Sequence, residues 1–311
     1  MHKLLKNKWI AYAISIFCMF LWGSAFPAVK LTYKELGIQG GDYFAMMFVA
    51  GIRFTIAGVL VLILMFIFDR KNVNQMITKF PYLLKLGIIV TTLGYLFFYI
   101  GTGNTTGMKA AILTSSSTFL VVIFSHFFLD ERFDIYKFIA IIFGLVGVII
   151  SNLNKEFNWS FSLIGEGFMF MNAVLGAIGT MYVKRSSSSV SAFAQSSGQF
   201  LYGGILLMLI GYFMLKTPLV FTFNSALLLL YSGFLSATAF TLWYMVLKEY
   251  KASEIAFLRL FIPFFGTFLS ALILGEKITW GIIIGLIFVI IGIIIINRTR
   301  ENIVKEKYVN R

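Results

Sequence analysis

Residues 94–150 (GYLFFYIGTGNTTGMKAAILTSSSTFLVVIFSHFFLDERFDIYKFIAIIFGLVGVII) and residues 239–295 (AFTLWYMVLKEYKASEIAFLRLFIPFFGTFLSALILGEKITWGIIIGLIFVIIGIII) follow one plan, offset by 145 positions. The identical residues that this offset aligns include Tyr99 with Tyr244, Ala111 with Ala256, Glu131 with Glu276, and Gly147 with Gly292. Each copy has an aromatic segment, a short turn, a long apolar segment, an acidic turn and a second apolar segment. In so apolar a chain, this repeat predicts a membrane module used twice, and such modules build transport paths at their interface.

The composition indicates an integral membrane protein. Hydrophobic residues make up 59% of the chain and charged residues only 13%, and a soluble protein of this length could not bury so much apolar surface. The apolar runs are roughly 17–25 residues long, enough for a helix to cross about 30 Å of hydrocarbon. The sequence therefore predicts an all-α membrane protein. Ten runs are expected to be transmembrane helices: 9–30, 43–68, 81–101, 108–129, 135–151, 161–183, 191–215, 225–247, 252–274 and 279–296.

The formal net charge of +13 is spread over the loops in a biased way. If the N-terminus is cytoplasmic, seventeen of the 26 basic residues fall on the cytoplasmic side. Six fall on the other side: Lys30, Lys34, Lys109, Lys155, Lys216 and Lys277. This is the positive-inside pattern, so both termini are expected in the cytoplasm and the chain in the inner membrane of a bacterium. The basic tail is expected to contact the lipid bilayer, and no nucleic-acid partner is expected.

Three further stretches carry a resemblance to a known family: WGSAFPAVK (22–30), GIRFTIAG (51–58) and the second-repeat stretch from Trp243 to Gly285. In this order and spacing they resemble the drug/metabolite transporter superfamily, specifically the bacterial EamA-type exporters built from two five-helix repeats. The resemblance implies that helices 1, 3, 4, 6, 8 and 9 line the cavity. One departure concerns the proline that the family often has on both long helices before the acidic turns. Pro263 is present, but its partner position holds Thr118, so helix 108–129 is expected to be straighter than helix 252–274 or to bend through Ser/Thr bonding.

Five helices per repeat fix how the halves are related. If the first helix begins inside, the sixth begins outside, so the two repeats are inverted about an axis in the membrane plane. The expected units are residues 1–152, residues 153–297 and a basic cytoplasmic tail at 298–311. One half can then rock against the other and expose a central site to either side.

Ionisable residues inside a membrane are functional candidates because they are costly to place there. Arg53 and Arg259 are expected to pair with an anionic group of the substrate; the alternatives are snorkelling or a structural pair with Glu166. Glu166 itself is the candidate proton carrier, with simple exposure at the outer rim as the alternative. Pro263 removes one helical hydrogen bond, and we expect it to free the carbonyl of Arg259 toward the cavity and form a hinge; a static bend is the alternative. His126 is expected to be merely hydrogen-bonded.

Uncharged polar and aromatic residues provide the mixture that a small amphipathic substrate needs. The candidates are Trp22, Ser24, Tyr95, Tyr99, Ser115, Ser116, Ser117, Trp243 and Tyr244, with Gln195 and Gln199 on the seventh run. The cavity helices implied by the resemblance retain most of this set and cast doubt on the two glutamines. The alternative for each residue is that Ser and Tyr hold helices together.

Other polar and small residues are expected to be structural. Asp134 and Thr279 stand where helices begin and are good N-caps. Glu131 and Glu276 are expected near helix N-termini, with gating at the membrane rim as the alternative. Small-residue spacing on the fifth and tenth runs favours close helix packing over a homodimer face; it involves Gly144, Gly147, Gly285 and Gly292.

The function expected from these patterns is a secondary transporter that exports a small metabolite, amino acid or amphipathic compound. No metal or cofactor is expected, since the chain has neither clustered Cys and His nor a phosphate-binding GxxxxGK[ST] loop. Without an ATPase domain, transport must use a gradient, with a proton or a counter-substrate as partner. A passive channel stays open as an alternative. An intramembrane enzyme is disfavoured because the chain has no HExxH helix or nucleophile–base pair.

Overall fold

The computed structural model describes residues 2–105, 107–152, 161–216, 218–275 and 277–309. Throughout these ranges the regular structure is helical. The elements are α1 (His2–Leu5), α2 (Lys8–Glu35), α3 (Tyr43–Phe68), η1 (Arg70–Asn72), α4 (Gln75–Thr78), α5 (Phe80–Leu86), η2 (Gly87–Leu93), α6 (Gly94–Gly103), α7 (Gly107–Leu129), α8 (Ile135–Asn152), η3 (Leu163–Gly167), α9 (Phe168–Ser186), α10 (Ala192–Phe213), α11 (Phe223–Glu249), α12 (Ala252–Ile255), η4 (Ala256–Phe261), α13 (Ile262–Leu274) and α14 (Trp280–Val309).

Each of the ten predicted apolar runs is helical. Within the described residues, eight helices are long and apolar enough to cross a membrane, and two shorter apolar helices lie at Ile135–Ile150 and Trp280–Gly292. Side-chain caps fix some of the helix starts. Asp42 accepts a hydrogen bond from the N–H of Ala45 at the start of α3, and Asp134 accepts one from the N–H of Lys137 at the start of α8. The predicted N-cap at Asp134 is therefore confirmed.

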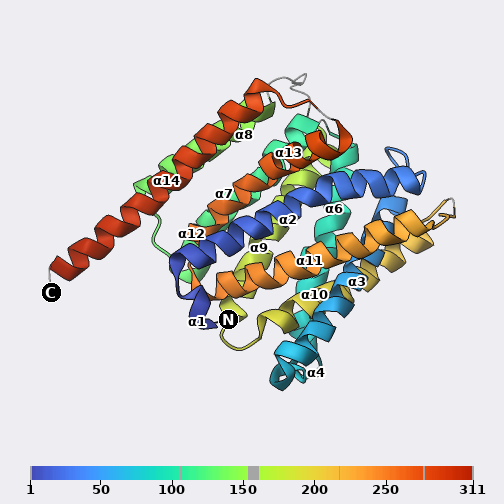
Figure 1. The fold of residues 1–311 in the computed structure, drawn as a ribbon, viewed down its shortest axis with the longest axis horizontal. Coiled ribbons are helices and arrows are strands. Elements are labelled where there is room, and N and C mark those ends of the chain that lie inside the picture. The colour runs from blue at the N-terminus through green and yellow to red at the C-terminus, as the bar shows by residue number, and fades with distance from the viewer. Residues whose placement is uncertain (1, 106, 153–160, 217, 276, 310–311) are drawn as a thin grey trace.

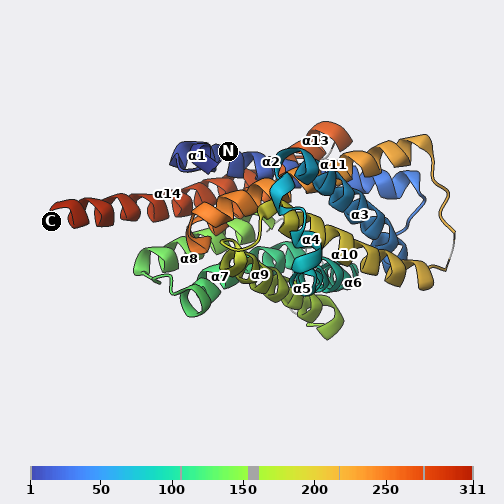
Figure 2. The ribbon, with the colours of Figure 1, turned by 90° about the horizontal axis from the view of Figure 1, so that it is seen from below.

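Helices from the two halves of the chain pack in reciprocal pairs (Figures 1 and 2). α3 packs against α10, and α8 against α14. The pair α2–α11 has a counterpart in α9–α6, and the pair α2–α13 has a counterpart in α9–α7. In Figure 1, α2 begins and α14 ends at the same end of the bundle. Exchanging the first and second halves maps each of these helix pairs onto itself or onto its counterpart.

Glycine allows the closest helix contacts. A Cβ added at Gly51 would lie 2.3 Å from the backbone of Met208, where α3 meets α10. A Cβ at Gly147 would lie 2.6 Å from the carbonyl oxygen of Gly285, where α8 meets α14. These contacts confirm the packing role predicted for the small residues of α8 and α14, because only a residue without a side chain permits such an approach.

Three predicted helices contain irregular turns, one of which is the π-helical η3 at the start of run 161–183. The stretch from Phe80 to Gly103 passes through π-helical η2, and the stretch from Ala252 to Leu274 passes through 3₁₀-helical η4 just before Pro263. By contrast, α7 is continuous through Thr118, which confirms that the helix without proline is the more regular of the two.

The carbonyl of Arg259 is not freed, and that expectation was wrong. It accepts a hydrogen bond from the N–H of Ile262 instead. Because Pro263 cannot donate, the chain tightens to the i→i+3 pattern and the preceding N–H satisfies the carbonyl.

Candidate functional site

Aromatic side chains from α2, α6 and α11 form a wall in the interior of the bundle, connected through Phe54 of α3 and Phe200 of α10. The ring centroids of Trp22 and Trp243 are 5.8 Å apart, and those of Trp22 and Phe240 are 4.9 Å apart, both edge to face. On α6, Tyr95 lies 6.1 Å from Tyr99 between ring centroids. The structure thus brings together the aromatic members of the predicted set, from segments far apart in the sequence.

Tyr244 donates a hydrogen bond to the side-chain carbonyl of Gln199 on α10. Gln199 is fully buried, and its amide nitrogen has no hydrogen-bond partner. The structure thus places Gln199, which the resemblance put in doubt, beside Tyr244. The amide of Gln195 donates to the backbone carbonyl of Val190 at 3.4 Å. A buried polar residue in an apolar run was the signal that could have kept Gln199 in the site.

Arg259 lies on η4 with Tyr95 and Tyr244 close enough to interact with its charge. Its Nε is buried without a hydrogen-bond partner. Within the described part of the chain, its guanidinium has no hydrogen bond to an acceptor and no carboxylate partner. The predicted alternative of a pair with Glu166 is wrong, because Glu166 is paired with Lys109. An unneutralised cation inside an apolar bundle is the expected feature of a site for an anionic group.

Three of the orphaned polar atoms in this region are N–H donors, and most of the other orphaned atoms of the described residues are hydroxyls, which can donate or accept. Besides Nε of Arg259, Nε1 of Trp22 and Nε2 of Gln199 are buried without partners. Buried donors normally find acceptors, so three orphaned N–H groups around one aromatic wall mark a place for acceptor atoms of a ligand. We define Trp22, Gln199, Trp243, Tyr244, Arg259 and Tyr95 as the central site.

The predicted serines differ in their environments, and two roles were considered for them: substrate binding and helix–helix contact. Ser117 is buried and its hydroxyl has no partner, whereas its neighbours Ser115 and Ser116 are half-buried on α7. Ser24 accepts a hydrogen bond of 2.7 Å from the hydroxyl of Tyr231 and donates to the carbonyl of Leu21. Ser24 therefore holds α2 to α11.

Arg53 is engaged within the protein. Its Nε and Nη2 donate to the hydroxyl of Ser236 on α11 at 3.0 and 2.8 Å, and its cation lies 5.0 Å from the centroid of the Phe54 ring. It lines a small cavity together with residues that include Tyr33 and Tyr99. The structural alternative for Arg53 has direct support, because this forked bonding ties α3 to α11.

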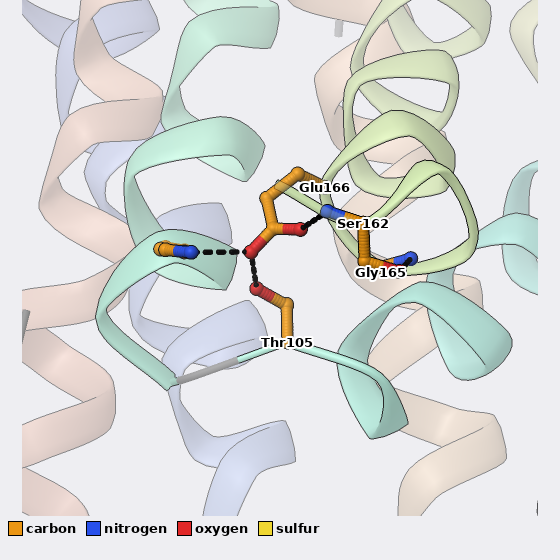
Figure 3. Close-up of polar contacts among 5 residues, drawn as sticks. Thr105, Ser162, Gly165 and Glu166 are labelled. Carbon is orange, nitrogen blue, oxygen red and sulfur yellow. Dashed lines mark hydrogen bonds and ion pairs between the residues drawn. The ribbon is translucent and has the colours of Figure 1, made fainter. Parts of the chain in front are cut away.

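Glu166 is paired, and the expectation of a carboxylate exposed at the rim was wrong (Figure 3). Its Oε1 lies 2.8 Å from Nζ of Lys109 and 2.7 Å from the hydroxyl of Thr105. Its Oε2 accepts the backbone N–H of Ser162 at 2.7 Å. A carboxylate held by these donors is stabilised in its charged form. This argues against a role for Glu166 as a proton carrier and supports a structural role, in which it links the start of α7 to the start of η3.

Glu131 caps a helix of the other half. Its carboxylate accepts the backbone N–H groups of Ala252 and Ser253 at 2.8 and 3.0 Å, and the hydroxyl of Ser253 as well. The helix-terminal role was predicted, but the helix is α12, not the neighbouring α8. Glu276 lies outside the described residues. His126 meets the carbonyl of Glu131 at 2.9 Å through Nδ1, as expected of a hydrogen-bonded histidine.

Lys184 of α9 binds the turn between α11 and α12. Its Nζ donates to the carbonyls of Leu247 and Tyr250, both at 2.7 Å, at the end of α11. The turn between α11 and α12 is thus held by a cation on its carbonyl side and by Glu131 on its N–H side, as helix dipoles favour. Among the described residues, no three His, Cys, Asp or Glu side chains cluster closely enough to hold a metal ion.

Comparison with known proteins gives consistent matches along the chain. The EamA-like transporter family matches residues 8–153 and 163–298. The chain is 25% identical over 277 residues to the uncharacterized transporter YoaV of Bacillus subtilis, covering 88% of this chain and 91% of that protein. It is 28% identical over 309 residues to the uncharacterized transporter YetK of the same organism, covering 94% and 88%. A solved crystal structure shares the fold with a TM-score of 0.78 at 17% identity, over 94% of this chain and 98% of that one.

Proposed function

Because the chain belongs to the EamA-like transporter family, we propose that it is a secondary transporter that moves a small metabolite, amino acid or amphipathic compound by alternating access. The single observation that carries the proposal is the family match in two successive segments, 8–153 and 163–298. The direction proposed is export across a bacterial inner membrane, driven by a proton gradient or by exchange. This direction rests on the resemblance of the sequence to EamA-type exporters.

The proposed architecture is ten transmembrane helices in two inverted repeats of five. The reciprocal packing of α2–α11 with α9–α6, and of α2–α13 with α9–α7, supports it, because a two-fold operation maps each such pair onto the other. The central site stands between the halves, with α2 and α6 from the first and α10, α11 and η4 from the second. Duplicated carriers bind their substrates in this position.

We further propose that this conformer is closed at the cytoplasmic end. There α7 packs against α12 and η4, and Glu131 and Lys184 hold the turn that starts α12. The helix α13, which continues the same span Ala252–Leu274 beyond η4, packs on α2. Rocking the halves to open the cytoplasmic end must break the Glu131 contacts, which makes them the proposed cytoplasmic latch.

Reconstitution into proteoliposomes separates a carrier from a channel. Vesicles are loaded with one compound at a time from a panel of amino acids, organic acids and amphipathic amines, and uptake of the labelled compound is followed. A carrier gives saturable uptake that is accelerated by unlabelled compound on the opposite side. Uptake that rises linearly without such acceleration indicates the channel, and absence of uptake for the whole panel contradicts transport of these classes.

A further inference from the structure

The charge of Arg259 has no counter-ion in the central site. The described residues give its guanidinium no hydrogen bond, and its Nε is buried. The two groups close enough to act on its charge are the hydroxyls of Tyr95 and Tyr244, which are neutral acceptors. A guanidinium so placed favours an anion strongly, since the surroundings contribute little solvent screening.

The acidic residues that could have neutralised it lie elsewhere. In the described part of the chain, the acids of the apolar helices stand near helix ends. Glu254, on α12 just before Arg259, interacts with the charges of Lys137 and Lys184, and the two acids that are deeply buried are committed. Glu166 is paired with Lys109, and Glu131 caps α12. The site therefore has no carboxylate for an ammonium group, and a cationic or zwitterionic ligand would place a positive charge beside Arg259.

The other orphaned groups reinforce the preference for acceptors. Nε1 of Trp22 can only donate, and the free atom of Gln199 is its amide nitrogen, because its carbonyl already accepts from Tyr244. Bidentate recognition of a carboxylate by arginine, with additional N–H donors nearby, is a strong and geometrically selective arrangement. Arg53 adds positive potential from α3, but its Nε and Nη2 are engaged by Ser236.

The walls of the site suit an aromatic body. Trp22 meets Trp243 and Phe240 edge to face, and Tyr95 lies 4.4 Å from Phe54 between ring centroids. Edge-to-face surroundings accept a further ring readily, with ring centroids about 4.5–7 Å apart.

We propose that the transported compounds are organic anions with an aromatic or flat apolar body and a carboxylate that binds Arg259. This inference rests on the proposed carrier function and narrows its substrate class: carboxylates are favoured, and amines and zwitterionic amino acids are rejected. Arg259 is then the residue that determines charge specificity, and Gln199 and Trp22 orient the acceptor end of the substrate.

Four probes of similar size test the charge preference on the purified full-length protein. They are 3-phenylpropionate, its neutral amide, zwitterionic phenylalanine and cationic 2-phenylethylamine, and their dissociation constants are measured by calorimetry. We expect the carboxylate to bind most tightly. Replacing Arg259 with Gln should weaken carboxylate binding by about tenfold to a hundredfold, the loss of a charged hydrogen bond, and should weaken binding of the neutral amide by a smaller factor.

Matched variants separate recognition from folding. Arg70→Gln removes an exposed arginine of η1 and should change none of the four constants. Arg259→Lys keeps the charge without the forked geometry and should bind the carboxylate with intermediate affinity, a rescue that a purely structural arginine would not show.

The proposal is overturned if 3-phenylpropionate binds no better than its amide, or if Arg259→Gln retains wild-type affinity for it. Transport in proteoliposomes is scored separately with the same probes. If the protein transports the amide or the amine but not the carboxylate, the proposed carrier function is retained and only the anionic substrate class is overturned.

Discussion

Glu131 and Ser253 lie 122 positions apart in the sequence, yet the carboxylate of Glu131 accepts both the backbone N–H and the hydroxyl of Ser253. A residue of the first half of the chain thereby provides the N-terminal cap of α12 in the second half. Lys137, in the first turn of α8, donates to the same hydroxyl at 2.8 Å, so Ser253 contacts both an acid and a base of the first half. These contacts link the halves at the end where we place the cytoplasm.

The first prediction concerns this cap. Glu131→Ala leaves two buried N–H groups without an acceptor, and we expect a loss of about 1–3 kcal/mol of stability, read as a lower melting temperature in detergent. Glu35→Ala removes an exposed acid at the end of α2 and should melt like the wild type. Equal melting of both variants would show that the cap contributes nothing to this conformer.

The second prediction concerns Arg53 and Ser236. Ser236→Ala removes the acceptor of two donors from a buried cation, so we expect destabilisation of about 1–3 kcal/mol. Guanidinium chloride unfolding in micelles measures it, with the exposed Ser188→Ala as control. If Ser236→Ala unfolds at the wild-type midpoint, Arg53 has another partner and its structural role is wrong.

The third prediction concerns Pro263. With Pro263→Ala, an N–H becomes available to the carbonyl of Arg259, and the 3₁₀ turn of η4 can relax to an α-helix. We expect slower turnover with little change in substrate affinity, measured on the same preparation. Pro81→Ala lies in the first turn of α5, where no hydrogen bond is missing, and should leave turnover intact. Unchanged turnover in Pro263→Ala would reduce the proline to a packing residue.

The fourth prediction concerns the close contact of α3 with α10. Gly51→Ala places a Cβ 2.3 Å from the backbone of Met208, and we expect overpacking to cost about 1–3 kcal/mol, visible as a lower melting temperature. Gly40→Ala is the control, since no atom lies within 4 Å of the added Cβ. A tolerated Gly51→Ala would mean that these helices can separate without cost.

The fifth prediction concerns topology. Cysteine placed at exposed Asn74 should react with an impermeant maleimide only from the cytoplasmic side, and cysteine at exposed Gln39 only from the outside. Native Cys18 is buried and gives little background. Labelling of the Asn74 variant on intact cells would reverse the proposed orientation.

The helices themselves were predictable because helix length, N-cap residues and helix-breaking prolines are local properties of the sequence. The run 43–68 is the helix α3 at the same bounds, and Pro263 correctly predicted that 252–274 is less regular than 108–129. The fate of the Arg259 carbonyl was not predicted, because a short 3₁₀ turn could satisfy it within the same helix.

The partners of the polar residues could not be predicted in the same way. Glu166 meets Lys109, Glu131 meets Ser253, and Tyr244 meets Gln199, and each of these pairs joins different helices. The sequence is compatible with many such pairings. Ser24 is therefore predicted as a site residue although Tyr231 already binds it, and Gln199 is doubted although it lies beside Tyr244.

The sequence by itself determined that this chain is a duplicated, helical membrane protein, because hydropathy, repeat length and charge bias act along the chain. Only the tertiary structure decided which face of each helix turns toward the centre. The physical reason is that lipid and protein interior are both apolar, so a membrane helix carries little of the polar–apolar periodicity that reveals orientation in a soluble one. Rotation about each helix axis is set by close contacts such as Gly51 on Met208, and these rotations leave Arg259 in the central site without a counter-ion.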